Sequence, residues 1–171
     1  MFSAIEFCNK QDVLIRHICA HAFLLTRKRD QVVAKLANFS QAKTRSACET
    51  LRYHGSKGEE EKVAIAWTAP ESIVKSEYTL KTEVFSVSQT VHEVLAHGVH
   101  PYQELGNMDI KQKYQQILKY RIWPERKPGE PESMFAALMR AFLYDPQQRP
   151  TIAELLRNFR NLPERTERLF V

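Results

Sequence analysis

The second half of the chain has the hydrophobic pattern of several amphipathic helices in a row. Apolar residues recur there at every third or fourth position, the spacing that places side chains on one face of an α-helix. Gly98 ends the first run and Pro70 begins a shorter helix before it, because glycine suits a helix C-terminus and proline suits the first turn. The four longest runs cover residues 79–97, 108–120, 132–144 and 150–161. Their core-facing positions are expected to be Leu80, Val84, Val87, Val91, Val94 or Leu95, Ile110, Tyr114, Ile117, Leu118, Phe135, Leu138, Met139, Phe142, Ile152, Leu155, Leu156 and Phe159.

The first half of the chain is patterned differently. Residues 1–10 predict one short helix. Two short apolar segments at residues 23–25 and 32–36, separated by a charged link, predict a small β-hairpin. Residues 38–66 show no clear periodicity and predict a long loop, which is an uncommon feature in a compact domain. This order of elements predicts a mainly α domain with one small hairpin.

The composition is that of an ordinary globular domain. The chain has 171 residues, of which 43% are hydrophobic and 26% are charged. No apolar run approaches the roughly 18 residues needed to span a bilayer, so a cytoplasmic protein without a membrane span is expected. The formal net charge of +5 is spread along the chain, which does not favour nucleic-acid binding. Cys8, Cys19 and Cys48 form an odd, sparse set that argues against a disulfide framework.

Three short motifs follow one another in the helical half. Residues 67–71 read W-T-A-P-E, residues 98–102 read G-V-H-P-Y, and residues 145–151 read D-P-Q-Q-R-P-T. In this order they resemble the C-terminal lobe (C-lobe) of a tyrosine-kinase-type protein kinase domain, in which A-P-E closes the activation segment. The residues that carry the first motif are Trp67, Ala69, Pro70 and Glu71.

The resemblance implies a domain organisation and one structural ion pair. Residues 1–161 correspond to a truncated kinase-like C-lobe with its activation segment at 38–71, and residues 162–171 form a tail. In the family, the glutamate of A-P-E pairs with the arginine of the last motif, and these positions hold Glu71 and Arg149 here. The upper N-lobe is expected to be absent, since no G-x-G-x-x-G and no lysine-bearing strand precede the catalytic-loop region.

The positions that carry chemistry in the family hold other residues here. With residues 23–25 aligned to the strand after the catalytic loop, the proton-accepting aspartate is replaced by His17 and the metal-binding asparagine by Ala22. The D-F-G motif has Asn38 at its aspartate and Ser40 at its glycine. A neutral amide is a weaker ligand than a carboxylate for Mg²⁺. The resemblance therefore implies a catalytically inactive, pseudokinase-like chain, for which ATP and Mg²⁺ binding are not expected.

Two other positions keep residues suited to a family role. Arg16 occupies the arginine position of the catalytic loop. Glu83 stands where the central helix of the family carries an aspartate that anchors the catalytic loop from below. A glutamate has a longer reach than an aspartate, so Glu83 is expected to be able to hold the same loop.

Tyr53 lies in the activation segment, where the family carries its regulatory tyrosine. One hypothesis is that another kinase phosphorylates Tyr53 and that the phosphate contacts Arg16 through charge-assisted hydrogen bonds. The competing interpretation is a loop tyrosine with no role. Phosphate mapping by mass spectrometry, after treatment with an active tyrosine kinase, distinguishes the two, because an unmodified Tyr53 would rule out the first.

His17, Cys19 and His21 form an H-x-C-x-H run that invites two other interpretations. These residue types bind zinc, but ligands spaced two apart are cramped and no fourth ligand is evident, so no metal site is expected. Cys19 activated by a neighbouring histidine would be a nucleophile, but the sequence offers no orienting group. The kinase register interprets the run as an altered catalytic loop.

The function expected from the resemblance is that of a protein-interaction or regulatory module in kinase signalling. Without an upper lobe, an apolar top face is expected to be partly uncovered and to bind an active kinase or a second copy of the chain. Two alternatives remain: half of a tyrosine kinase that needs an N-lobe supplied elsewhere, and a non-functional truncated fragment. The residues assigned to the top face are Phe2, Ile5, Ile18, Phe23 and Phe39.

Overall fold

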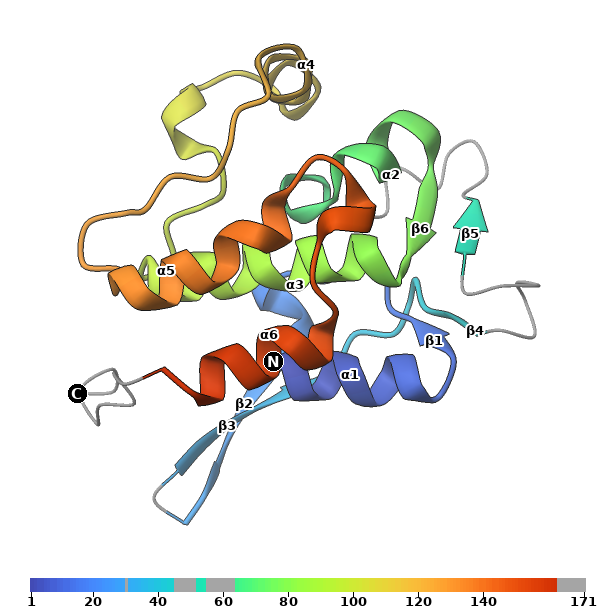
Figure 1. Cartoon of the computed structure of the whole chain (residues 1–171), viewed down its shortest axis with the longest axis vertical. Coiled ribbons are helices and arrows are strands. Elements are labelled where there is room, and N and C mark those ends of the chain that lie inside the picture. The colour runs from blue at the N-terminus through green and yellow to red at the C-terminus, as the bar shows by residue number, and fades with distance from the viewer. Residues whose placement is uncertain (30, 45–51, 55–63, 163–171) are drawn as a thin grey trace.

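The computed structural model describes residues 1–29, 31–44, 52–54 and 64–162, with residues 52–54, 110 and 111 described by their backbone alone. The fold is mostly helical, in agreement with the fold class expected from the sequence (Figure 1). Its α-helices are α1 (Phe2–Lys10), α2 (Pro70–Lys75), α3 (Leu80–Leu95), α4 (Ile110–Tyr120), α5 (Glu132–Met139) and α6 (Ile152–Arg160). Its strands are β1 (Val13–Leu14), β2 (Phe23–Lys28), β3 (Gln31–Leu36), β4 (Lys43–Thr44), β5 (Arg52–His54) and β6 (Glu77–Thr79).

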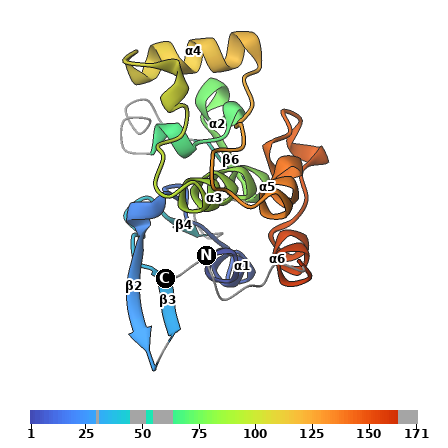
Figure 2. The ribbon, with the colours of Figure 1, turned by 90° about the vertical axis from the view of Figure 1, so that its left-hand side faces the viewer.

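Helix α3 runs through the centre of the molecule and the other elements surround it (Figures 1 and 2). Most of its residues are buried, including polar ones. Its first turn is fixed by a capping box, in which the Thr79 hydroxyl accepts hydrogen bonds from backbone N–H groups while the Thr82 hydroxyl accepts one from the Thr79 N–H. Buried polar side chains favour hydrogen bonds inside the protein, and Glu83 and Glu93 of α3 make theirs to the segments that pack beside the helix.

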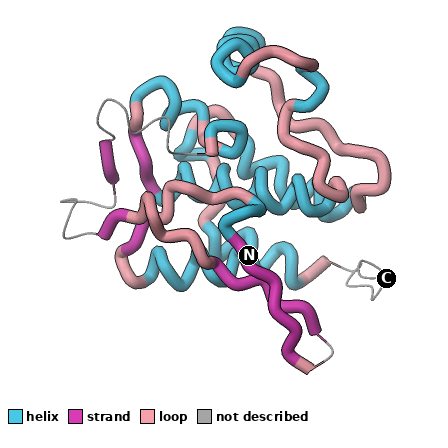
Figure 3. Tube along the Cα trace, turned by 180° about the vertical axis from the view of Figure 1, so that it is seen from behind, coloured by secondary structure: helices cyan, strands magenta, loops and turns pink. Residues whose placement is uncertain are grey.

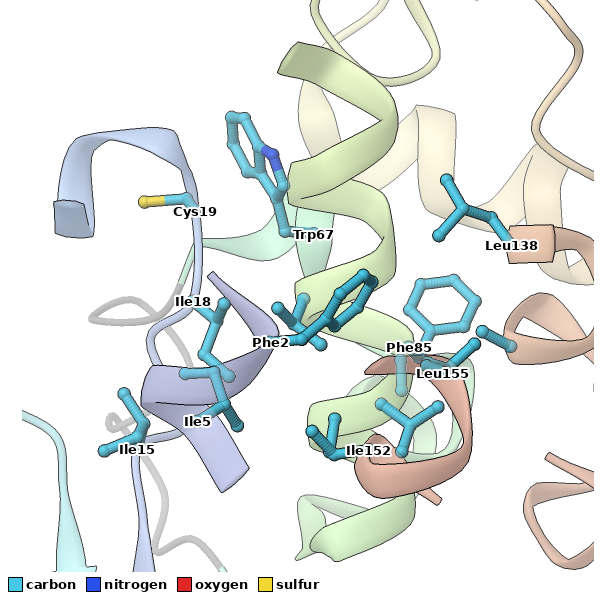
Figure 4. Packing of buried hydrophobic residues seen from close by; sticks show 14 of the residues in the cluster. Phe2, Ile5, Ile15, Ile18, Cys19, Trp67, Phe85, Leu138, Ile152 and Leu155 are labelled. Atoms are coloured by element: carbon cyan, nitrogen blue, oxygen red, sulfur yellow. The ribbon is translucent and has the colours of Figure 1, made fainter. Parts of the chain in front are cut away.

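The core lies between α1, α3, α5 and α6 (Figure 4). Phe2 of α1 packs against Phe159 of α6 with a ring-centroid distance of 5.1 Å, and Phe85 of α3 packs against Phe142 at 5.6 Å. Ile152 and Leu155 of α6 belong to the same buried cluster. The helical runs that contain α3, α5 and α6 thus contribute to this cluster, whereas the described side chains of α4 do not. Leu80, expected to face the core, is instead 38% exposed in the first turn of α3.

The apolar top face expected from the sequence is largely not at the surface. Phe2, Ile5, Ile18 and Phe23 are only 6%, 0%, 1% and 7% exposed. The physical reason is that α1 packs on both α3 and α6, so its inward residues are covered from within the chain. Phe39 alone among the five fits the expectation, at 49% exposed.

The predicted hairpin is confirmed as the antiparallel pair β2–β3. Its register runs from Phe23 opposite Leu36 to Lys28 opposite Gln31, and Figure 3 shows it projecting from the helical body. Leu24 and Leu25 on β2 are 64% and 72% exposed. The exposed apolar surface of this region is thus on the hairpin rather than on α1.

Two sequence expectations fail at the level of elements. The run 132–144 is not one helix, because α5 ends at Met139 and a short 3₁₀ turn, Arg140–Phe142, follows it. Met139 at the end of α5 is 37% exposed, whereas Phe142 in the 3₁₀ turn is buried. Residues 38–66 also contain two short strands, since β4 pairs with β1 and β5 pairs with β6. Across the described helices, none has both the length and the apolarity for a membrane crossing.

Candidate functional site

Glu83 of α3 holds the segment that follows β1. Its carboxylate is buried and accepts hydrogen bonds from the backbone N–H of Ile15, from the backbone N–H of Arg16 at 3.0 Å and from Asn9 Nδ2 at 2.6 Å. Burial raises the pKa of Glu83 to about 7, although the three hydrogen bonds act to lower it. A single carboxylate on the central helix therefore fixes the start of the loop at residues 15–22.

Arg16 is enclosed between this loop and β6. Its backbone adopts a φ of +65°, and the residue is buried. The guanidinium carbon lies 4.4 Å from the centroid of the Tyr78 ring on β6, in cation–π geometry, and Nη1 lies 3.5 Å from the Gln41 carbonyl oxygen. Arg16 therefore joins the loop to the segment that follows β3.

The next loop positions hold side chains of limited chemical capacity. His17 Nε2 lies 3.5 Å from Cys19 Sγ, and burial raises the pKa of the Cys19 thiol, which disfavours the reactive thiolate. Ala22 is fully buried and presents only a methyl group. Within the part of the chain that the structure describes, no three histidine, cysteine or acidic side chains gather as a metal site would require.

Asn38 and Ser40 are joined by two hydrogen bonds. Asn38 Oδ1 accepts a hydrogen bond from the Ser40 backbone N–H at 3.1 Å and another from the Ser40 hydroxyl at 2.8 Å. This is the local turn that asparagine side chains commonly make with the residue two positions on. The amide oxygen is therefore engaged within its own segment, at an exposed end of the hairpin.

Glu71 and Arg149 form a bidentate ion pair, although they lie 78 positions apart. Arg149 Nη1 lies 2.6 Å from Glu71 Oε1, and Nη2 lies 2.8 Å from Oε2. Arg149 also donates to the carbonyl oxygens of Leu143 at 2.7 Å, Lys81 at 3.0 Å and Tyr144 at 3.4 Å, so all five guanidinium N–H groups have partners. The pair and its carbonyl contacts join α2, α3 and the turn before α6.

The segment before α2 is tied to the core by contacts that the sequence analysis did not single out. Trp67 Nε1 donates to Glu93 Oε2 of α3 at 2.8 Å, and the ring meets His100 edge-on at 4.8 Å. The Tyr114 hydroxyl of α4 donates to the Thr68 carbonyl oxygen at 3.3 Å. Ala69 is buried as the N-cap of α2, and Pro70 is its first residue. The signal in the sequence was Glu93 itself, a second glutamate within the predicted helix 79–97, ten positions after Glu83.

The predicted phosphoacceptor, Tyr53, has a side chain outside the described part of the chain. Its backbone lies in β5 opposite Tyr78 of β6, the residue whose ring makes the cation–π contact with Arg16. The role predicted for Tyr53 with Arg16 stays a prediction.

Comparison with known proteins identifies the family to which the chain belongs. The family model described as protein tyrosine and serine/threonine kinase matches residues 1–159. The chain belongs to this kinase family. It is 26% identical over 161 residues to the tyrosine-protein kinase transforming protein Abl of Abelson murine leukemia virus, which covers 94% of this chain and 20% of that relative.

Two other kinases of the family match in the same way. Tyrosine-protein kinase ABL2 of Homo sapiens is 26% identical over 161 residues, covering 94% of this chain and 12% of the relative. Tyrosine-protein kinase Fgr of Mus musculus is 28% identical over 130 residues, covering 76% of this chain and 23% of the relative. The chain thus spans less than a quarter of the length of these relatives.

Proposed function

We propose that this kinase-family chain is a catalytically inactive C-lobe that acts as a protein-interaction module in kinase signalling. The observation that supports the proposal is the contrast within one site. Glu83 holds the backbone of the loop at residues 15–22, and the Glu71–Arg149 pair holds α2 to the turn before α6, so a hydrogen-bonded frame is present. The loop itself carries no carboxylate for Mg²⁺. Retention of the frame without the chemistry favours binding over turnover.

The side chains at the metal-binding positions do not fit Mg²⁺. That ion prefers carboxylate oxygens with near-octahedral geometry. Ala22 has no donor atom, and the Oδ1 atom of Asn38 is held by two hydrogen bonds from Ser40. Phosphoryl transfer depends mainly on positioning and on electrostatic stabilisation by the metal. His17 stands at the position of the proton acceptor and does not supply the electrostatic stabilisation that the metal would give.

The hairpin is the surface best suited to a protein partner. Leu24, Leu25 and Val32 are each at least half exposed on β2 and β3, and Phe39 is 49% exposed just beyond β3. By the strand register, Leu25 and Val32 lie on one face of the hairpin and Leu24 on the other, so both faces expose apolar side chains, a feature that favours association. Both strands also have an edge without a neighbouring strand in the described sheet, which offers backbone N–H and C=O groups to a partner.

The first arm of the test measures nucleotide binding and turnover. ATP with Mg²⁺ is expected to leave the melting temperature unchanged and to give no phosphoryl transfer to a tyrosine peptide. An Asn38→Ala variant serves as the control, because it removes the remaining amide oxygen from the site. A Mg²⁺-dependent rise in melting temperature that disappears in Asn38→Ala would contradict the proposal.

The second arm measures association by light scattering coupled to size exclusion. The chain is expected to form a discrete complex, either with a second copy or with the catalytic domain of an active tyrosine kinase. Leu24→Lys combined with Leu25→Lys is expected to abolish it, because two charges then enter the apolar contact. Val74→Lys on α2, where the valine is 63% exposed, is the matched control. If the chain is a monomer and forms no complex with the active kinase, the proposed interaction role is wrong.

A further inference from the structure

A polar cleft of roughly 610 Å³ lies beside α6, and no residue of the loop at residues 15–22 lines it. Its walls come from the end of α5, the turn before α6 and α6 itself, which lie next to one another (Figures 1 and 2). Lys81, at the start of α3, completes the lining and donates from Nζ to the Arg149 carbonyl oxygen. None of the residues at the catalytic positions of the family lines this cleft. Arg149, which forms the ion pair with Glu71, is part of the lining.

The cleft carries an excess of positive charge. Lys81, Arg140 and Arg157 line it, and none of them takes part in an ion pair within 4 Å among the residues described. The Arg149 charge is matched by Glu71, so it does not contribute to the excess. Glu154 is the one acidic residue in the lining, which leaves three cations against one carboxylate.

Glu154 is already engaged by its own helix. Its Oε2 atom accepts hydrogen bonds from the Thr151 backbone N–H at 2.7 Å and from the Thr151 hydroxyl at 2.9 Å. These bonds, the backbone one first, lower the pKa of Glu154. The carboxylate therefore serves the N-terminus of α6 as half of a capping box, while the nearby charges of Lys81 and Arg157 also act to lower its pKa.

The chemistry of the lining indicates the class of ligand. Sites for small organic molecules are mostly apolar and enclose the ligand, whereas this cleft is polar and its arginines are exposed at the rim. Arginine guanidinium groups match phosphoryl oxygens in a bidentate manner, and clusters of them recognise phosphorylated segments. We propose that the cleft between α5 and α6 binds a phosphorylated side chain on a segment of a partner protein, through Arg140, Arg157 and Lys81.

The proposal is tested by fluorescence anisotropy with a labelled peptide of neutral residues that carries one central phosphotyrosine, and with its unphosphorylated twin. Only the phosphorylated peptide is expected to bind, and more weakly as salt is raised. Arg140→Ala combined with Arg157→Ala is expected to weaken binding by at least about tenfold, because two charge-assisted contacts are lost. Arg160→Ala, which removes an exposed arginine of α6 outside the lining, is the control and should leave binding unchanged.

Three results would overturn the proposal. The twin peptides could bind equally, the double variant could bind as the wild type does, or inorganic phosphate could displace the peptide at the peptide's own affinity. The last result would assign the cleft to a free anion instead of a protein segment. The hairpin association serves as an internal reference, because the double variant at residues 140 and 157 is expected to leave it intact.

Discussion

Arg149→Ala is expected to lower the free energy of unfolding by about 3–5 kcal/mol, a large share of the 5–15 kcal/mol that is typical of a domain. The Arg149 side chain is 0% exposed and the Glu71 side chain 13% exposed, so removal of the arginine leaves a mostly buried carboxylate without its cation. The carbonyl oxygens of Leu143, Lys81 and Tyr144 lose a donor at the same time. The effect therefore exceeds that of a surface ion pair, which is typically below about 1 kcal/mol.

Urea unfolding of Arg149→Ala, Glu71→Ala and the double variant measures this effect and separates the pair from the carbonyl contacts. We expect Arg149→Ala to be at least as damaging as Glu71→Ala, because the three carbonyl contacts belong to the arginine alone. Arg149→Lys should recover little, since an ammonium group cannot make the bidentate contact. Arg160→Ala controls for the loss of one positive charge. An unchanged melting temperature in Arg149→Ala would mean that the pair does not form in solution.

The contribution of Glu83 to the free energy of unfolding is expected to fall as the pH rises from about 4.5 to about 7. The pKa of this carboxyl is about 7 in the folded protein against 4.5 in the reference state, so the folded state holds the proton more tightly over that interval. An acid with a raised pKa favours folding below its unfolded pKa, and this contribution is lost as the pH rises through the folded pKa. A shift of this size corresponds to about 3 kcal/mol at most.

The measurement is denaturant unfolding of the wild type and Glu83→Gln between pH 4.5 and 8. Glutamine keeps an oxygen for the backbone N–H groups of Ile15 and Arg16 but does not titrate. Burial lowers the pKa of His92 and raises that of Glu130, so both add their own pH dependence. The difference between the two proteins removes these contributions, because both residues are present in each. Parallel curves for the two proteins would contradict the role assigned to Glu83.

The sequence was most informative for elements whose structure depends on residues close together in the chain. The helical periodicity of α3, α4 and α6 depends on short-range spacing, and the hairpin β2–β3 depends on two apolar segments around a charged link. The strands β4 and β5 escaped prediction because each has only two or three residues, too few for any pattern to show. Their existence depends on partners that lie far along the chain, β1 and β6.

The same limit applies to the candidate site. Motif order brought Glu71 and Arg149 into one hypothesis, and the structure places them in contact. The bond between Trp67 and Glu93 and the cleft beside α6 follow from how separate helices pack, which spacing alone does not encode. The burial of Phe2 and Ile18 was missed for the same reason, since only the packing of α1 against α3 and α6 reveals what covers them.

The anchoring of the loop by Glu83 has a consequence for how such a chain changes through mutation. The atoms that hold the loop are backbone N–H groups of Ile15 and Arg16, which are the same whatever side chains follow them. The side chain of Ala22 has no polar atom, and the Oδ1 atom of Asn38 accepts its hydrogen bonds from Ser40 within the same turn. The residues that hold the shape of the loop are therefore not the residues that would decide its chemistry, so a substitution at position 22 or 38 leaves the Glu83 anchor in place.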